Sequence, residues 1–270
     1  MKLFKKLGSL LVAAACVCSL VACGSKTADK VIKVGASPTP HALILEAARP
    51  LIEAKGYKLE IVEFTDYVLP NTSLQAGELD ANYFQHEPYL LDFNANNGTD
   101  LVSVGAIHFE PLGIYPGKVT ALSALPETLT IAIPNDKTNR GRALLLLNQL
   151  GLIELSTTEH GFEGTTTADI KDAKGVTIRE IEAANIPNIL QDVSFGVING
   201  NYALAAKISD KALATEATDS LAATKTANVI AVKRGNEETE KTKVLLEALK
   251  SDTVKKYIQD TFGSSVIPVF

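Results

Sequence analysis

The sequence predicts an α/β protein with two lobes, and three observations lead to this prediction. Short apolar runs of strand character alternate with helical segments from Val31 onward. A loop rich in glycine and proline is expected at residues 113–117; it interrupts this alternation, and a second series begins after it. About 240 residues take part, which is more than most single domains contain. We therefore expect a first lobe at residues 31–111 and 229–270 and a second lobe at residues 112–228.

The first series predicts strands that alternate with short helices. Residues 37–40 turn the chain out of the first strand into a helix that Gly56 ends, because glycine is common just past a helix. Pro70 and Pro88 each stand near the start of a further helix, a position that proline tolerates. The expected strands are residues 31–35, 59–64 and 101–107.

The second series contains a long apolar helix at residues 139–150, which follows a strand and a Pro-Asn-Asp turn. A late strand at residues 228–232 can return to the first lobe. Two connecting segments, near residues 111–116 and 225–229, would then join the lobes and allow them to close on a ligand. The other expected elements are strands at 130–133, 176–180 and 195–198 and helices at 237–250 and 252–261.

The start of the chain predicts an export signal followed by a lipid attachment site. Three lysines within the first six residues precede an apolar segment at residues 7–21, and small residues lead to Cys23. The apolar segment is shorter than the roughly 20 residues that cross a bilayer. The pattern resembles bacterial lipoproteins, in which such a cysteine receives lipid. We expect a signal peptide at residues 1–22, a lipidated tether at residues 23–30, and a protein anchored to the cell membrane outside the cytoplasm.

Composition excludes some classes of protein. Loss of residues 1–22 removes three lysines and no acid, so the formal net charge falls from −5 to −8. We expect no nucleic-acid partner for so acidic a chain. Cys23 would be the only thiol of the mature protein, so no disulfide can form within it, and the 46% of hydrophobic residues must supply an ordinary core.

No motif indicates covalent catalysis or a bound cofactor. The chain has no glycine-rich phosphate loop and no Gly-x-Ser-x-Gly elbow. The four histidines, His41, His86, His108 and His160, share no short metal-ligand spacing, although His86 and Glu87 are adjacent and could join distant residues. We expect a protein that is not an enzyme, with no catalytic residue, no cofactor and no metal site.

Three segments place polar and aromatic side chains where strands meet helices, which is where α/β proteins tend to hold ligands. The first comprises residues 66–71 and 77–89 and contains four aromatic rings and a histidine. The second, residues 133–142, is a turn into a helix with two arginines. The third, residues 197–203, is a strand that ends in amides. These segments are the candidates for a ligand site.

The same segments resemble a known family, the NlpA or MetQ lipoproteins, which bind methionine for the methionine ABC importer. The resemblance runs from Val31 to Phe270. It implies a two-lobed periplasmic-binding-protein fold, type II-like, with the ligand cleft between the lobes. It also implies that the protein delivers methionine to a permease driven by a separate ATPase, and we expect a monomer. The strings that carry it are Glu-Leu-Asp-Ala-Asn-Tyr-Phe-Gln-His at 78–86, Ile-Pro-Asn-Asp at 133–136, Gly-Arg-Ala-Leu-Leu-Leu-Leu at 141–147, and residues 183–187 and 227–232.

The resemblance assigns the ligand's carboxylate to Arg142, and a guanidinium suits that group because it offers a planar fork of donors. Arg140 lies two positions away and should face elsewhere on the helix, so we expect it to be solvated. Asn199 matches an amide that binds the ligand's amino or carboxylate group, and Asn228 matches one beside the hinge. Asn201 is a weaker candidate because it could cap the following helix.

Tyr67, Phe84, His86 and Tyr89 match the pocket that encloses the methionine side chain in the family. A thioether is apolar and polarisable, so aromatic rings are good surroundings for it. His86 should donate a hydrogen bond rather than titrate. Tyr83 alternates with Phe84 along a strand, so we expect it to face away from the pocket into the core.

Three departures from the family pattern lie near the cleft mouth or the hinge. Leu43 stands where an acidic residue is common, Asn188 stands where a basic residue often follows the proline, and residues 221–225 replace a shorter link. These differences leave D-methionine or a dipeptide such as glycyl-methionine open as the ligand. Two alternatives from other classes are an extracellular hydrolase and a structural or adhesive lipoprotein whose cleft binds nothing.

Overall fold

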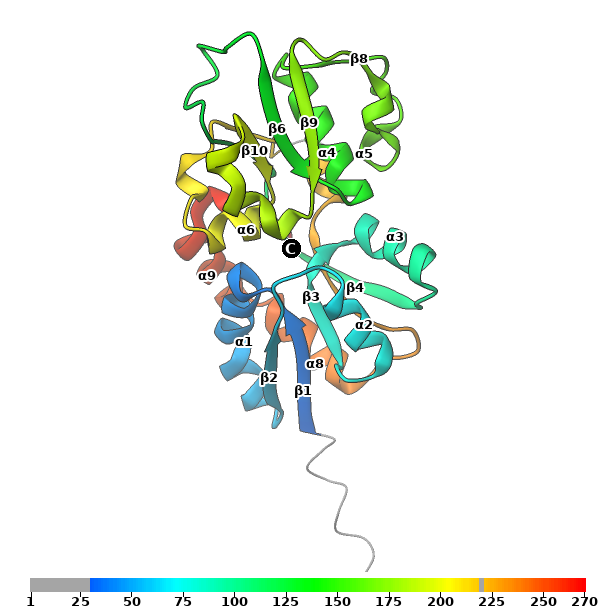
Figure 1. Cartoon of the computed structure of the whole chain (residues 1–270). Coiled ribbons are helices and arrows are strands. Elements are labelled where there is room, and N and C mark those ends of the chain that lie inside the picture. Colours follow the sequence, from blue (N-terminus) through cyan, green and yellow to red (C-terminus); the bar gives the residue numbers. More distant parts are fainter. Residues whose placement is uncertain (1–29, 219–220) are drawn as a thin grey trace, which may run out of the picture.

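Two α/β lobes, joined by two crossing segments, make up the computed structural model, which describes residues 30–218 and 221–270 (Figure 1). The predicted signal peptide and lipidated Cys23 lie outside the described residues, as does all of the predicted tether except Lys30. Among the residues that are described, no helix has both the length and the apolar character needed to cross a membrane.

The first lobe is built on a six-stranded sheet with the order β13-β4-β12-β3-β1-β2. The first strand, β1, pairs in parallel with both β2 and β3, as the strand–helix–strand pattern predicts. The late strand β12 lies antiparallel between β3 and β4, so the chain does return to this sheet. The strands are β1 (Val31–Ala36), β2 (Lys58–Glu63), β3 (Ala81–His86), β4 (Leu101–Phe109), β12 (Asn228–Lys233) and β13 (Ile267–Pro268).

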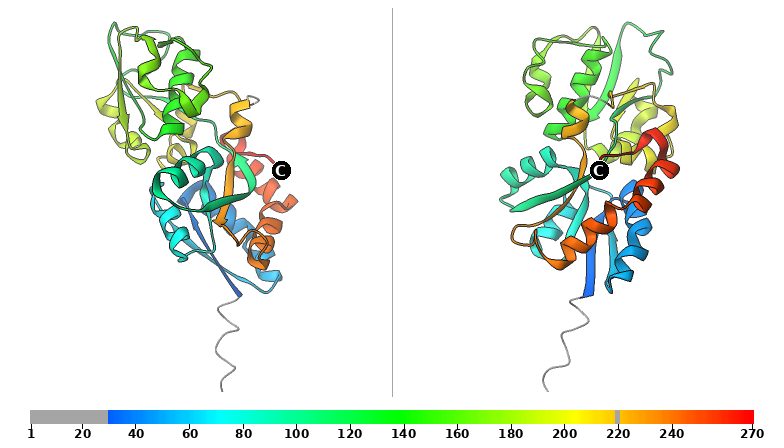
Figure 2. Two further views of the ribbon diagram at one scale, coloured as in Figure 1. Left: turned by 90° about the vertical axis from the view of Figure 1, so that its right-hand side faces the viewer. Right: turned by 180° about the vertical axis from the view of Figure 1, so that it is seen from behind.

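Helices cover both faces of this sheet (Figure 2). On one face α1, α8 and α9 share a core with the buried strand residues Ile32 and Val34. On the other face α2 and α3 pack Leu74 and Leu90 against Leu101. The helices are α1 (Leu43–Ala54), α2 (Leu69–Ala76), α3 (Glu87–Asn97), α8 (Glu240–Leu249) and α9 (Asp252–Phe262), with helical turns η2 (Pro38–Ala42) and η6 (Gly263–Ser265).

The second lobe has a five-stranded sheet with the order β11-β5-β10-β6-β9, in which β6 is parallel to β9 and β10. Its long helix α4 buries Leu144 and Leu147 against Ile131 and Ile133 of β6. On the opposite face, η4 and α6 pack against the same sheet. The elements are β5 (Gly113–Pro116), β6 (Leu129–Pro134), α4 (Lys137–Gln149), β7 (Glu154–Leu155), α5 (Gly161–Gly164), η3 (Thr167–Asp169), β8 (Ile170–Asp172), β9 (Val176–Ile181), η4 (Ala183–Asp192), β10 (Phe195–Ile198), α6 (Gly200–Ala205), η5 (Ser209–Lys211) and β11 (Ala214–Thr215).

The loop predicted at residues 113–117 is wrong over most of its length. Gly113–Pro116 is the strand β5, which pairs antiparallel with β10 on one side and β11 on the other. Glycine and proline are poor strand formers, but Ile114 and Tyr115 are buried and the neighbouring strands supply pairing on both edges. Tertiary pairing therefore overrides the local preference, as it often does for strands.

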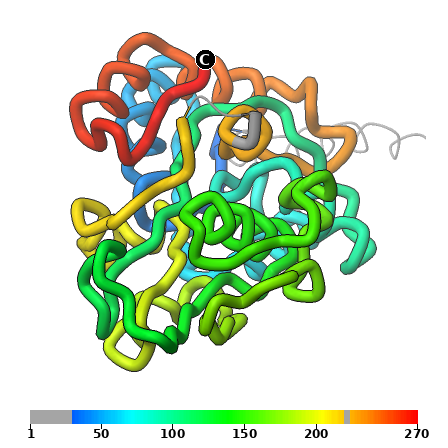
Figure 3. The backbone as a smooth tube through the Cα atoms, turned by 90° about the horizontal axis from the view of Figure 1, so that it is seen from above, coloured from blue at the N-terminus to red at the C-terminus, as the bar shows by residue number. Residues whose placement is uncertain are grey.

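Two segments cross between the lobes, residues 110–112 from β4 to β5 and residues 216–227 from β11 to β12. The second includes α7 (Leu221–Lys225), which lies at the waist of the molecule (Figure 2) and is seen end-on from above (Figure 3). Hydrogen bonds join the two crossings. The amide N–H of Glu216 donates to the carbonyl of Leu112 at 2.9 Å. The predicted lobe boundaries near residues 111 and 228 stay predictions.

Candidate functional site

The seven residues predicted for the ligand site all line one hollow between the lobes. The space inside it that a water molecule can reach is about 20 Å³, which is room for about one water, so the lobes enclose less free space than an amino acid needs and must separate to admit one. The structure thus places the predicted residues together, and their contact with a ligand remains a prediction. They are Tyr67, Phe84, His86, Tyr89, Arg142, Asn199 and Asn228, and the hollow is also lined by Gln85, Glu110, Asn139, Gly200 and Asn201.

The hollow lies at the carboxyl ends of strands from both sheets. His86 is the last residue of β3, Glu110 follows β4 and Asn199 follows β10. Arg142 lies in α4, the helix that begins after β6. Open α/β sheets bind ligands beyond these strand ends, so the location agrees with the general rule for such sheets.

Arg142 is almost completely buried, and other groups of the protein already bind most of its guanidinium. Its Nε and Nη2 atoms donate to the two carboxylate oxygens of Glu216 at 3.0 and 2.6 Å. Nη2 also donates to the carbonyl of Glu110 at 3.3 Å, and Nη1 donates to Oδ1 of Asn139 at 3.0 Å. A guanidinium has five N–H groups, so one hydrogen on Nη1 remains for a ligand. The prediction of a fork open to the ligand is wrong on this edge, because Glu216 occupies it.

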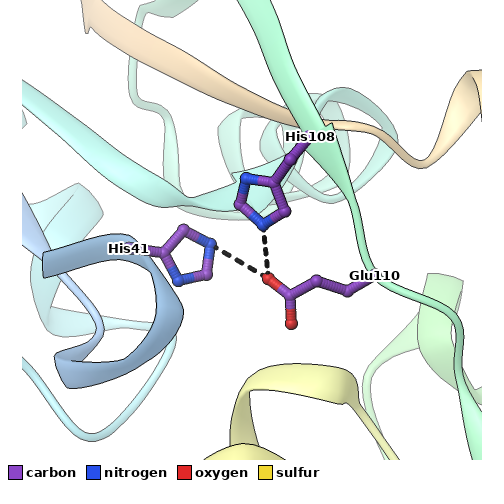
Figure 4. Close-up of side chains that lie close together, drawn as sticks. All are labelled: His41, His108 and Glu110. Carbon is purple, nitrogen blue, oxygen red and sulfur yellow. Dashed lines mark hydrogen bonds and ion pairs between the residues drawn. The ribbon is translucent and has the colours of Figure 1, made fainter. Parts of the chain in front are cut away.

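Glu110 is the most important residue of the hollow that the sequence analysis missed. Its side chain is buried, and Oε1 accepts a hydrogen bond from Nε2 of His108 at 2.7 Å and lies 3.4 Å from Nε2 of His41 (Figure 4). Burial raises the pKa of Glu110 to about 7. Its other oxygen faces Gly200, where an added Cβ would lie 2.7 Å from Oε2. The absence of a side chain at Gly200 therefore leaves this oxygen room.

The two histidines around Glu110 are neutral hydrogen-bonding groups. Burial lowers the pKa of His41 to about 4 and that of His108 to about 3. The hydroxyl of Tyr83 binds Nδ1 of His108, so a proton on Nε2 of His108 can be donated to Glu110. The prediction that Tyr83 faces the core is confirmed, because its side chain is fully buried.

His41, His108 and Glu110 are also the group of described residues whose ligand atoms lie close enough together to suggest a metal ion. Their geometry is that of a hydrogen-bonded network. Two ligands bound to one Zn²⁺ at about 2.0 Å in a tetrahedron would be about 3.3 Å apart, whereas His108 Nε2 and Glu110 Oε1 are 2.7 Å apart.

His86 connects the lobes as a hydrogen-bond donor. Its Nδ1 atom accepts from the amide N–H of Tyr89 at 3.1 Å, which places the ring proton on Nε2. Nε2 therefore donates to Oδ1 of Asn139 in the second lobe at 3.2 Å. Burial, and then the charge of Arg142, lower the pKa of His86 to about 3. His86 is therefore a neutral hydrogen-bond donor in the structure, as expected from the sequence.

Three aromatic rings form one wall of the hollow. The centroids of Tyr67 and Phe84 are 5.8 Å apart, and Tyr89 lies 5.7 Å from Tyr67 and 6.2 Å from Phe84. The hydroxyl of Tyr67 donates across the cleft to Oδ1 of Asn201 at 2.6 Å. The helix cap predicted for Asn201 is wrong, because Asn199 holds the N-cap position of α6 and Asn201 lies within the first turn, bound to Tyr67.

The amides Asn199 and Asn228 offer complementary groups. Oδ1 of Asn228 is bound to Nε2 of His41 at 3.1 Å, which leaves the NH₂ of that amide as a donor. Oδ1 of Asn199 is buried and has no hydrogen-bond partner among the described residues. A buried acceptor without a partner costs free energy, so Asn199 is prepared to accept a hydrogen bond from a ligand.

Arg140 lies apart from the hollow, although it is less solvated than predicted. Its Nη1 atom pairs with Glu180 at 3.2 Å, and 21% of its side chain is exposed. The neighbouring strand β9 supplies this partner, which the helix pattern alone could not indicate.

This arrangement can now be compared with known proteins. Residues 32–270 match the family described as NlpA lipoprotein. The chain belongs to the NlpA lipoprotein family. Methionine-binding lipoprotein MetQ of Bacillus subtilis is 38% identical in an alignment of 277 residues that covers 99% of this chain and 98% of that protein.

Solved structures of similar proteins share the fold of this NlpA lipoprotein. Lipoprotein Tp32 of Treponema pallidum is 38% identical, with a TM-score of 0.82 and coverage of 89% of this chain and 100% of that chain. A nutrient binding protein from Burkholderia cenocepacia, solved bound to methionine, is also 38% identical, with a TM-score of 0.82 and coverage of 88% and 100%. The resemblance and the two-lobed periplasmic-binding-protein fold inferred from the sequence are confirmed.

Proposed function

We propose that this protein binds methionine between its lobes and delivers it to the permease of an ABC importer driven by a separate ATPase. One observation carries the proposal. A guanidinium, a carboxyl group and a wall of aromatic rings meet at one small hollow, and these are the groups that a zwitterion with an apolar side chain requires. Binding without covalent chemistry is the whole of the proposed activity.

Each part of the ligand has a partner in this proposal. The free Nη1 hydrogen of Arg142 and the NH₂ of Asn228 bind the carboxylate, since both are donors. The carboxyl group of Glu110 and Oδ1 of Asn199 bind the ammonium group, since both are acceptors. The rings of the wall surround the thioether, whose burial stabilises the complex by about 1.5–3 kcal/mol.

The ligand is a single amino acid in this proposal, because the guanidinium, the carboxyl group and the ring wall meet at one hollow and match the three parts of one amino acid. MetQ of Bacillus subtilis is named for methionine binding, and the Burkholderia cenocepacia structure contains methionine, which supports the same ligand here. Lipid on Cys23 holds the protein at the outer side of the cell membrane, and the protein acts as a monomer.

Calorimetry on residues 24–270 tests the proposal. L-methionine should bind, whereas N-acetylmethionine, which lacks the ammonium group, and glycyl-methionine should bind far more weakly. Methionine at 100 times its Kd should raise the free energy of unfolding by about 2.7 kcal/mol. Binding of glycyl-methionine alone would refute the proposed ligand, and no stabilisation by any amino acid would favour the adhesive alternative.

A matched pair of arginine variants locates the site. Arg142→Ala should weaken methionine binding by 10-fold to 100-fold or more, because hydrogen bonds to charged groups contribute about 1.5–3 kcal/mol. Arg140→Ala, on the same helix but outside the hollow, should leave the Kd within about twofold. Equal effects of the two substitutions would place the ligand elsewhere.

A further inference from the structure

We infer that Glu216 is a positioning residue for the ligand's carboxylate, which it affects only through Arg142. The inference rests on the proposed function. Glu216 is absent from the residues that line the hollow, yet its carboxylate receives both Nε and Nη2 of Arg142. It therefore determines where the guanidinium lies without touching the ligand.

The contacts of Arg142 leave its side chain little freedom. Glu216 takes one edge of the guanidinium, the carbonyl of Glu110 takes the second hydrogen of Nη2, and Asn139 takes one hydrogen of Nη1. The remaining donor is fixed in direction because a guanidinium is planar. The ligand's carboxylate thus meets one oriented N–H group. Glu216 supplies two of the four contacts that orient the guanidinium of Arg142.

Glu216 is itself held by the crossing between the lobes. Its Oε2 atom accepts from the amide N–H of Leu112 at 2.9 Å, and its own amide N–H donates to the carbonyl of Leu112 at 2.9 Å. Only 12% of its side chain is exposed. The hydrogen bonds that hold Glu216 therefore join both crossing segments. Through Glu216, Arg142 should keep one position relative to the hinge as the ligand binds.

Charge gives Glu216 a second effect. Burial is the largest influence on the pKa of Arg142 and lowers it, but Glu216, with smaller contributions from Tyr67 and Asp136, raises it above its usual value. A guanidinium that is buried without a counter-ion would be costly in the empty protein. Glu216 keeps Arg142 charged and in place, so the site is organised before the ligand arrives.

Glu216→Gln tests the inference, because glutamine has nearly the same shape but must present an NH₂ to Arg142 or to Leu112. Kd should be measured by calorimetry for L-methionine and for L-methioninamide, which lacks the carboxylate. We expect 10-fold to 100-fold weaker binding of methionine and little change for methioninamide. Glu216→Asp, which keeps the charge, should recover part of the affinity. Glu180→Gln is the matched control, since it breaks the Arg140–Glu180 pair of the same helix outside the hollow.

The other outcomes overturn the inference. Tighter methionine binding by Glu216→Gln would make Glu216 a competitor for the guanidinium, and equal loss for both ligands would make its role purely structural. An unchanged methionine Kd in Glu216→Gln would show that carboxylate binding by Arg142 does not depend on Glu216. NMR exchange of the Arg142 Nε–H provides a readout without ligand, and protection unchanged in Glu216→Gln would also contradict the inference. Wild-type protein that binds no methionine would instead refute the proposed function itself.

Discussion

Replacing Glu110 by glutamine should separate binding from stability. The substitution removes the carboxylate proposed to bind the ligand's ammonium group while keeping a side chain of similar size. Methionine should bind 10-fold to 100-fold more weakly, because hydrogen bonds to charged groups contribute about 1.5–3 kcal/mol. Calorimetry measures this loss, and Glu87→Gln, an exposed glutamate outside the hollow, is the control. Wild-type affinity in Glu110→Gln would refute the role given to this residue.

The same variant should change how stability depends on pH. Burial raises the pKa of Glu110 from 4.5 to about 7, so between these values the folded protein holds a proton that the unfolded chain releases. Raising the pH through this window therefore destabilises the wild-type protein, by about 1.4 kcal/mol per unit and about 3 kcal/mol in all. Glu110→Gln lacks this loss. Its free energy of unfolding in urea, relative to wild type, should rise from pH 4.5 to 7 and stay constant above pH 7.

The affinity for methionine should also depend on whether the Glu110 carboxyl group holds its proton. Methionine stays a zwitterion between pH 5 and 8, but Glu110 must lose its proton to face an ammonium group. Wild-type affinity should therefore fall by up to about tenfold per unit below pH 7, and this dependence should vanish in Glu110→Gln. A wild-type Kd that is constant from pH 5.5 to 7.5 would show that the carboxyl group is already ionised in the empty cleft.

Three further predictions follow from the surroundings of Glu110. Tyr83→Phe should lower the free energy of unfolding by about 1–3 kcal/mol in urea titrations, because Nδ1 of buried His108 loses its partner; an unchanged midpoint would contradict this. Gly200→Ala should weaken methionine binding about tenfold or more in calorimetry, since the new Cβ would lie 2.7 Å from Oε2 of Glu110; wild-type affinity would contradict it. His41 and His108, with pKa values of about 4 and 3, charge in the unfolded chain below pH 6.5 but not in the folded protein, so each should remove stability as the pH falls from 6.5. Replacing either by glutamine should flatten the acid side of a melting-temperature profile.

Local sequence was enough to predict most of the elements that carry the site. The strand at residues 195–198 has the predicted bounds because Phe195–Ile198 is an uninterrupted buried run that ends at Asn199-Gly200. The helix expected at residues 139–150 begins two residues earlier, at Lys137, because Asp136 caps it through the amide N–H of Asn139. In each case hydrophobicity and a terminal residue, which are visible in sequence, determine the structure.

The partners of the site residues depend on long-range pairing, and local sequence contains no signal for it. Arg142 and Glu216 are 74 residues apart, and His41 and Asn228 are 187 residues apart. Glu216 stands in a polar stretch without periodicity. Glu110 had one available signal, namely its position between the strand predicted at residues 101–107 and the crossing expected near residues 111–116. Carboxyl groups at such strand ends are candidates for ligand contacts.

The contacts between the lobes show how a small ligand can control closure. In the structure the lobes are joined across the cleft by neutral hydrogen bonds, from His86 to Asn139 and from Tyr67 to Asn201, and by one partly exposed ion pair, Lys137–Asp92 at 3.5 Å. Each hydrogen bond contributes only about 0.5–1.5 kcal/mol, so they favour the closed form weakly. In the proposed complex a zwitterion would add charged contacts to Glu110 at the crossing and to Arg142 in the second lobe, and we expect these contacts to form together only when the lobes are closed. Because a ligand shifts an equilibrium only by its differential affinity, methionine favours closure through these two charges, and an analogue that lacks either charge should bind without closing the lobes as fully.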